Sequence, residues 1–180
     1  METPSSSPTL SEVPPPTKRK RLLTRILTSC ISIYILIFLI ITLFQQRFIY
    51  FPFHYDVALP AELKHWHINN TQVGFCHEVP NPKNIWIFSH GNASQAAERA
   101  YILAHVDRND STYIVEYPGF GKREGSPSQA SLNQSVTEAY LALRKQFPNI
   151  PVCAIGESLG SGPASNLATL PTPPDKIVLI

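Results

Sequence analysis

The stretch from Val152 to Gly162 constrains the fold of this chain more than any other. Val152-Cys-Ala-Ile155 is a short apolar run with the length and β-branched content of a buried strand. It leads directly into Gly156-Glu-Ser158-Leu-Gly160, and small residues that suit a helix follow. Strand, sharp turn and helix are the context of a G-x-S-x-G nucleophile elbow.

The two glycines of this motif have a steric reason in such an elbow. The turn holds Ser158 in a strained conformation that lifts its hydroxyl above the sheet edge, and side chains at Gly156 and Gly160 would collide where helix and strand pack closest. The start of the helix directs free N–H groups toward a developing oxyanion. The alternative is a glycine-rich β-to-α turn that contains a serine by chance.

A long apolar run near the amino terminus predicts a membrane span. Ile26 to Phe44 contains no charged residue and is dominated by Ile, Leu and Phe. At about 1.5 Å per residue, such a helix covers most of a hydrocarbon core of about 30 Å. A cleaved signal peptide is the competing interpretation, but the run is long for its apolar region and no A-x-A-like site follows. We therefore predict a transmembrane signal anchor over residues 22–46, followed by interfacial aromatics at Phe48-Ile-Tyr50-Phe51.

The residues before the span set its expected orientation. Residues 1–21 form a Pro/Ser-rich and basic tail, predicted to be disordered, which ends in Lys18-Arg-Lys-Arg21. Such a cluster is also typical of a nuclear-localisation or nucleic-acid patch, but the apolar run after it favours a membrane flank. Because more Lys and Arg precede the span than follow it, we expect a cytoplasmic N-terminus and a folded domain on the extracytoplasmic (periplasmic or lumenal) side. The net charge of +2 gives no reason to expect nucleic acid as a partner.

Residues 52–83 predict an antiparallel entry to a sheet. His65-Trp-His-Ile68 and Val73–Val79 flank Asn69-Asn70-Thr71, which suits a turn. The two histidines of the first run would share one strand face, where a cysteine or histidine of the second run would complete a metal site. No second ligand pair has a recognisable spacing, so we expect surface histidines and no metal.

The remaining chain alternates short β-rich runs with helical patterns. Strands are expected at 85–89, 112–116, 152–155 and 176–180, a helix-like segment capped by Ser94 follows the first of them, and an amphipathic helix covers 131–147 before Pro148. Such alternation predicts βαβ units and a mainly parallel sheet, whose reactive groups lie at the carboxyl ends of the strands. His90-Gly91-Asn92, Tyr117–Gly121 and Ser158 all follow such ends. Three loops are therefore expected to converge on one edge.

The order of these motifs resembles the α/β-hydrolase fold family. The sequence strand–His-Gly-Asn, strand–Tyr-Pro-Gly-Phe-Gly, helix, strand–Gly-Glu-Ser-Leu-Gly-Ser-Gly is most similar to the membrane-anchored branch with one N-terminal span. That branch includes lysophospholipid and acyl-thioester hydrolases. The resemblance covers residues 50–180, so the expected class is α/β, with a mainly parallel sheet of the α/β-hydrolase type after one transmembrane helix.

The resemblance implies a serine hydrolase that cleaves carboxylic ester or thioester bonds through an acyl-serine intermediate, without a cofactor. Lipid or other small-molecule acyl compounds would be its substrates, and the membrane its partner. By this likeness Ser158 is the nucleophile, and the backbone N–H groups of Asn92 and Leu159 form the oxyanion hole. His90 and Gly91, like Gly156 and Gly160, would shape the loops without reacting.

The chain departs from the family pattern after the nucleophile. In this fold the triad follows the order Ser, Asp or Glu, then His, yet the residues after Ser158 include one acid, Asp175, and no histidine. Asp175 precedes the last expected strand, on the wrong side of the sheet to orient a catalytic histidine. We therefore expect an α/β-hydrolase domain that is incomplete at the C-terminus, with an unpaired apolar edge strand, and a 180-residue chain that is inactive by itself.

Two interpretations from other classes stay open. One is a non-catalytic, membrane-tethered hydrolase-like scaffold that binds a lipid or a protein. The other is a single-pass anchor or signalling protein whose basic tail binds anionic lipid, which leaves the Gly156–Gly160 motif and His90-Gly-Asn92 without an explanation.

Overall fold

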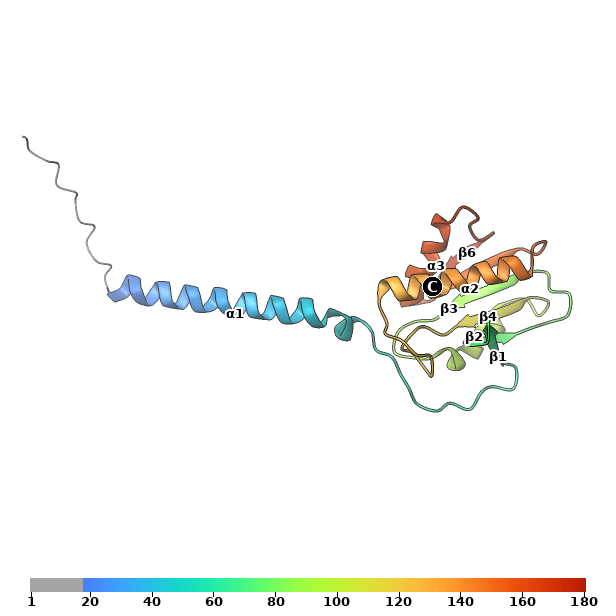
Figure 1. Ribbon diagram of the computed structural model, residues 1–180, viewed down its shortest axis with the longest axis horizontal. Coiled ribbons are helices and arrows are strands. Elements are labelled where there is room, and N and C mark those ends of the chain that lie inside the picture. Colours follow the sequence, from blue (N-terminus) through green and yellow to red (C-terminus); the bar gives the residue numbers. More distant parts are fainter. Residues whose placement is uncertain (1–17) are drawn as a thin grey trace, which may run out of the picture. The chain divides into compact units, whose positions relative to one another are not determined.

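A computed structural model describes residues 18–180, so residues 1–17 of the predicted tail lie outside the described part of the chain. The described residues divide after Gln45 into two units, of which the second, residues 46–180, contains the sheet (Figure 1).

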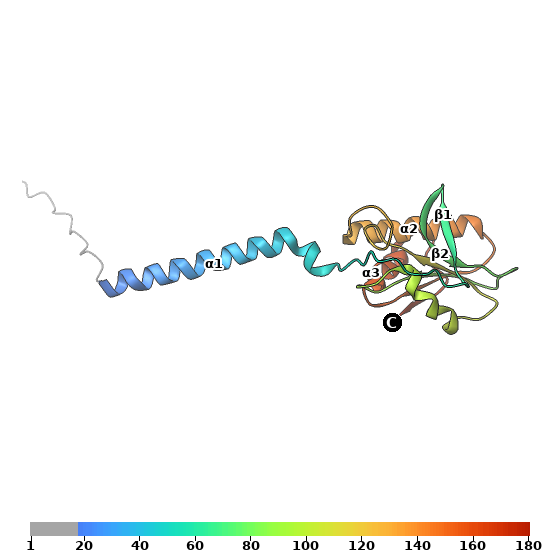
Figure 2. The same ribbon diagram turned by 90° about the horizontal axis from the view of Figure 1, so that it is seen from below.

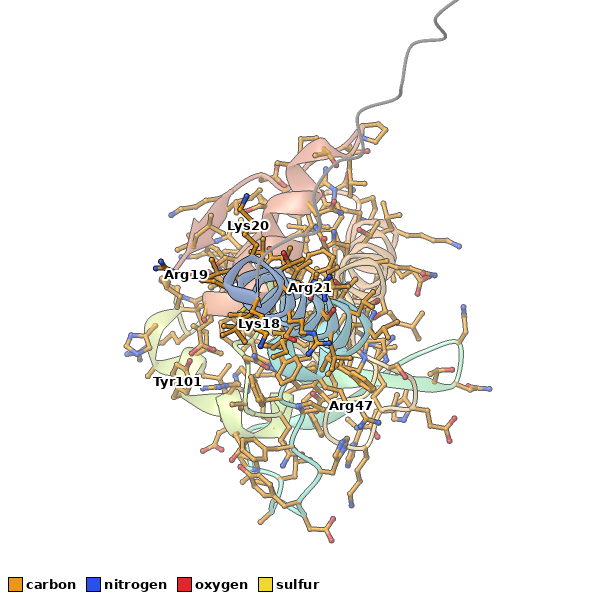
Figure 3. All side chains as sticks on the ribbon, turned by 90° about the vertical axis from the view of Figure 1, so that its left-hand side faces the viewer. Lys18, Arg19, Lys20, Arg21, Arg47 and Tyr101 are labelled. Atoms are coloured by element: carbon orange, nitrogen blue, oxygen red, sulfur yellow. The ribbon has the colours of Figure 1, made fainter. Side chains whose placement is uncertain are left out.

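The first unit is formed by most of one long helix, α1 (Lys18–Ile49), none of whose residues is buried. By length and composition it is the one helix among residues 18–180 that could cross a membrane. Lys18 to Arg21 form its first turn, and Arg47 lies in its last (Figure 3). The tail prediction is therefore wrong for these four residues, because Lys and Arg are good helix formers and continue the helix that the apolar run nucleates.

The sheet has six strands in the order β1-β2-β4-β3-β5-β6. Their bounds are β1 (Lys64–Ile68), β2 (Thr71–His77), β3 (Ile85–Ser89), β4 (Ser111–Val115), β5 (Val152–Gly156) and β6 (Ile177–Leu179). The hairpin β1–β2 is antiparallel and turns at Asn69 and Asn70, which both have positive φ as the primed hairpin turns require. Strands β4, β3, β5 and β6 are parallel to one another. The predicted mainly parallel sheet is confirmed.

Helices cover both faces of this sheet (Figure 2). On one face α2 (Gln129–Gln146) and α3 (Ser161–Asn166) pack over side chains such as Ile87 and Val115. On the other face the 3-10 helix η1 (Ala96–His105) packs over their strand neighbours Phe88 and Ile114. Because adjacent strand residues point to opposite faces, central strands buried on both sides must be apolar throughout.

Two local expectations, the cap of the segment after β3 and the length of the last strand, need correction. The segment after β3 forms the kinked 3-10 helix η1, whose N-cap is Gln95 and not Ser94, because the Glu98 carboxylate accepts the Gln95 N–H instead. The helix after the elbow is short: α3 passes into the 3-10 turn η3 (Leu167–Thr169) before the prolines. The last strand, β6, has three residues, and its outer edge pairs with no strand in the described part of the chain.

Candidate active site

The ends of three neighbouring strands lie in register and set up the site. Ser89, the last residue of β3, pairs with Val115 at the end of β4 and with Gly156 at the end of β5. The residues that follow, Glu116, His90 and Glu157, therefore begin three adjacent loops at the carboxyl edge of the sheet. This is the convergence that the sequence predicts.

Ser158 lies on a tight bend between β5 and the short helical turn η2 (Ser158–Gly160). Its φ is +48°, in the left-handed region that costs a non-glycine residue about 1–3 kcal/mol. Hydrogen bonds on both sides hold this conformation: Glu157 N–H donates to the Ser89 carbonyl at 2.9 Å, and Ser158 N–H donates to the Ile180 carbonyl at 2.7 Å. The Ser158 residue is exposed, so its hydroxyl is accessible above the sheet edge.

The two motif glycines have the steric role that the sequence suggests. A Cβ on Gly160 would lie 1.9 Å from the Ser89 carbonyl oxygen, which is backbone and cannot move aside. A Cβ on Gly156 would lie 2.7 Å from Ser161 Cα and 2.8 Å from Ala164 Cβ. Any side chain at either position would push the first turn of the helix away from the sheet.

The loop after β3 lies directly beside the elbow. A Cβ on Gly91 would lie 3.5 Å from Ser158 Cβ. Within residues 18–180, the backbone N–H groups of Asn92 and Leu159 donate no hydrogen bond to another loop or strand. An oxyanion hole needs two N–H donors that converge beside the serine hydroxyl, one of them on the residue after the nucleophile.

His90 is completely buried and is held by its neighbours. Its Nε2 lies 3.2 Å from Glu116 Oε1, and its Nδ1 lies 2.7 Å from the Gly91 carbonyl oxygen. Its ring lies over Tyr117, with centroids 4.3 Å apart, and the Tyr117 hydroxyl donates to the His90 carbonyl. Burial raises the pKa of Tyr117, so this phenol remains a donor at neutral pH. With both ring nitrogens in contact with loop groups, His90 fixes the shape of its loop.

Glu157, at the unspecified motif position before the serine, joins the elbow to the loop of Gly91. Its Oε2 accepts the Gly91 N–H at 2.9 Å. Its Oε1 accepts the Tyr101 hydroxyl at 2.9 Å and lies 3.5 Å from Arg99 Nη1. Tyr101 is on η1 (Figure 3), and its pKa is raised by burial and by the hydrogen bond to Glu157. One carboxylate thus fixes the distance between the two loops.

Other polar groups lie elsewhere. Asp175 Oδ2 accepts the N–H of Val152, the first residue of β5, and pairs with Arg144 at 2.8 Å, so this acid lies at the amino edge of the sheet. The rings of His65 and His67 are 6.4 Å apart, and no cluster of three possible metal ligands occurs in residues 18–180. No histidine in that range is hydrogen-bonded to the Ser158 hydroxyl.

The roles of Glu116 and Glu157 are not evident from the motifs. Glu116 follows β4 directly, as His90 follows β3, and parallel neighbours with matched ends bring such residues together. That signal is present in the sequence but requires the strand order. Glu157 occupies the unspecified position of the motif, and its partners come from η1.

Comparisons with known proteins concern the sequence and the fold. No protein-family model matches the chain. The chain is 33% identical over 93 residues to the α/β-hydrolase domain-containing protein 17B of Xenopus tropicalis, and equally so to that of Homo sapiens. Each match covers 49% of this chain and 32% of the relative. The chain therefore spans about a third of the length of these curated relatives.

Solved structures share the fold. A thermostable carboxyl esterase from Bacillus coagulans has a TM-score of 0.53 at 14% identity, over 65% of this chain and 43% of the esterase. The protein TT1662 from Thermus thermophilus has a TM-score of 0.52 at 18% identity, over 65% of this chain and 55% of that protein. At these identities the likeness concerns the fold alone.

Proposed function

From the premise that the chain is a homologue of α/β-hydrolase domain-containing proteins and has the α/β-hydrolase fold, we propose that it contributes the nucleophile of a serine hydrolase. The bonds cleaved are carboxylic esters or thioesters. The observation that supports this most is the exposed Ser158 hydroxyl on a left-handed bend, beside a second loop with a free N–H group.

In the proposed reaction Ser158 Oγ attacks the acyl carbonyl carbon and loses its proton to a base. The negative charge that develops on the carbonyl oxygen is stabilised by the N–H groups of Leu159 and Asn92, each worth a few kcal/mol in such sites. The C–O or C–S bond then breaks, and the alcohol or thiol leaves with a proton. Water hydrolyses the resulting acyl-serine and regenerates the hydroxyl.

No histidine among residues 18–180 is hydrogen-bonded to the Ser158 hydroxyl to act as the base that this reaction requires. A serine hydroxyl without a base is a weak nucleophile at neutral pH. We therefore propose that residues 1–180 alone hydrolyse esters very slowly, and that an acid and a histidine from outside this range complete the triad. A non-catalytic scaffold is the second candidate function, and the same unpartnered hydroxyl is the observation that favours it.

An activity assay distinguishes the two. The protein expressed from its natural gene in its own cells is assayed with p-nitrophenyl acyl esters and with an acyl thioester. Ser158→Ala should lower the hydrolysis rate by a factor of about 1,000 or more. Ser165→Ala, an exposed serine of the helix α3 that follows the elbow, is the matched control and should retain full activity. Equal rates for wild type and Ser158→Ala would favour the scaffold.

We also propose that α1 anchors residues 50–180 to a membrane, with the N-terminus in the cytoplasm. Translation in the presence of microsomes tests the orientation, because Asn69-Asn70-Thr71 is an exposed acceptor for N-glycosylation. Glycosylation of Asn69 should occur and that glycan should be lost in Asn69→Gln, measured in a background where Asn92, Asn109 and Asn133, which also begin N-x-S triplets, are replaced by Gln. In a Ser5→Asn variant, which places an acceptor in the tail, the tail should stay unmodified. The reverse pattern would show the opposite orientation.

A further inference from the structure

A segment of exposed aromatic residues lies next to the candidate site. Residues 48–55, here called the strap, belong to the same unit as the sheet. Five of their large apolar side chains are about half exposed: Phe48, Ile49, Phe51, Phe53 and Tyr55. From Phe51 onward the chain has no regular secondary structure, and Pro52 between Phe51 and Phe53 is only partly buried. Phe53 and Tyr55 contact each other edge to face, with centroids 5.5 Å apart.

The strap is fixed to the domain through its backbone. The Asn92 side chain makes two hydrogen bonds with the strap backbone: its Nδ2 donates to the Ile49 carbonyl at 2.6 Å, and its Oδ1 accepts the Phe51 N–H at 2.9 Å. Further along, the Phe53 carbonyl accepts the Gly121 N–H at 2.9 Å, and the Tyr55 carbonyl accepts from Gln95 Nε2 at 2.8 Å. The backbone groups of the strap are thus bonded to the domain, and the Tyr55 hydroxyl donates to Glu98 of η1, whereas the rings of Phe51 and Phe53 are about half exposed.

Asn92 belongs to the loop that lies beside Ser158. Under the proposed function its backbone N–H serves the oxyanion hole, and its side chain holds the strap. The strap also continues α1 directly, since the last turn of that helix ends at Ile49. From Phe44 to Ile49 the helix rises about 7 Å, comparable to the headgroup layer of about 5–8 Å that flanks the hydrocarbon core.

We propose that the strap is a docking surface for the lipid headgroup layer of the membrane that holds α1. Exposed aromatics at the end of a span, with Arg47 beside them, have the composition of a membrane interface. The strap thereby keeps the loop of Asn92, and with it Ser158, at the bilayer surface.

The competing arrangement is a strap that leaves the bilayer. If Phe51 to Tyr55 ran straight outward, each residue would add about 3.3 Å, and Phe53 would reach bulk water beyond the headgroups. The depth in the bilayer of a label at position 53 therefore distinguishes the two arrangements, whereas the depth of a label on α1 is the same in both.

The test uses the whole chain in phosphatidylcholine nanodiscs, labelled with a thiol-reactive NBD fluorophore. Cys30→Ser removes the exposed native thiol, and Cys76 and Cys153 are buried. Burial, followed by the charge of Glu78, raises the pKa of the Cys76 thiol to about 11, which keeps it unreactive at neutral pH. Single labels are then introduced by Phe53→Cys on the strap, Ile35→Cys on α1 and Leu141→Cys on α2. Leu141 is the matched control, since it is 48% exposed and Phe53 is 43% exposed.

The expected result is a blue-shifted NBD emission and reduced quenching by aqueous iodide at Phe53→Cys, with unshifted emission and full quenching at Leu141→Cys. A deep label at Ile35→Cys together with a fully quenched label at Phe53→Cys would overturn the docking surface and leave the anchor intact. A fully quenched label at Ile35→Cys would overturn both. None of these outcomes depends on hydrolysis, so failure of the proposed reaction is a separate result.

Discussion

The elbow and the strap both contact the loop of Gly91 and Asn92, but different forces hold them. At the elbow, backbone packs on backbone so closely that Gly160 has no room for a Cβ. The strap is held by hydrogen bonds from side chains such as Asn92 and Gln95, and its own side chains are exposed. Close packing tolerates almost no change, whereas individual exposed hydrogen bonds contribute about 1 kcal/mol each. We therefore expect a rigid elbow around Ser158 and a strap that can be loosened without unfolding the domain.

The largest effect is expected at the elbow. Gly160→Ala should destabilise the domain by about 4 kcal/mol or more, because its Cβ would overlap the Ser89 carbonyl. Gly162→Ala is the matched control: no atom lies within 4 Å of its Cβ position, and alanine in helix α3 should stabilise by up to about 1 kcal/mol. Thermal unfolding in detergent micelles measures both. Similar melting temperatures for the two variants would show that the elbow is not packed as described.

The second largest loss of stability is expected at the buried pair of His90 and Glu116. Glu116→Ala leaves the His90 ring and the Ala96 N–H without their carboxylate partner in a buried place, at a cost of about 3–5 kcal/mol. Exposed Glu138→Ala, which loses only a hydrogen bond from Gln134, should cost less than about 1 kcal/mol. Chemical denaturation compares the two, and equal midpoints would contradict a structural role for the pair.

A smaller and local effect is expected at the strap. Asn92→Ala removes both hydrogen bonds to the strap, so the Phe51 amide should exchange its hydrogen faster while global stability falls by only about 1–2 kcal/mol. Asn166→Ala, which loses one long contact of 3.5 Å to Thr137, is the control. Exchange measured by mass spectrometry on peptides covering residues 48–55 reports the difference. Unchanged exchange would mean that Asn92 does not hold the strap.

The last prediction involves the smallest change to the protein and compares the reaction rates of a buried thiol of the sheet and a thiol on the strap. Burial raises the pKa of Cys76 to about 11 from about 9, so its thiolate fraction at pH 8 should be about a hundredfold below that of an exposed thiol. The label site Phe53→Cys should react with an aromatic disulfide at the rate of a free thiol. Because the reactive species is the thiolate, the Cys76 rate should continue to rise with pH above 9. Equal rates at pH 8 would place Cys76 in solvent.

Those parts of the fold that depend on residues close together in the chain could be predicted from the sequence. The elbow, the Asn69–Asn70 turn and the apolar strands follow from residues that are neighbours in the chain. The 3-10 helix η1 could not be predicted, because its start depends on the capping box of Gln95 and Glu98, to which Ser94 only adds a hydrogen bond. The contacts of Asn92 with Ile49 and Phe51 bridge about 40 residues and leave no periodic pattern. The hydrogen bond between Glu157 and Tyr101 joins residues 56 apart and likewise leaves no periodic pattern.

The central claim, that Ser158 is a nucleophile poised on an elbow, is tested most directly with a fluorophosphonate reagent. Membranes from cells that express the natural gene, and the purified 180-residue chain, are treated and digested with trypsin. We predict an adduct on Ser158 within the peptide Gln146–Lys176 from the natural protein, and little labelling of the 180-residue chain. An unmodified Ser158 in the natural protein would contradict the claim, and rapid labelling of the 180-residue chain would reveal a base that residues 18–180 do not show.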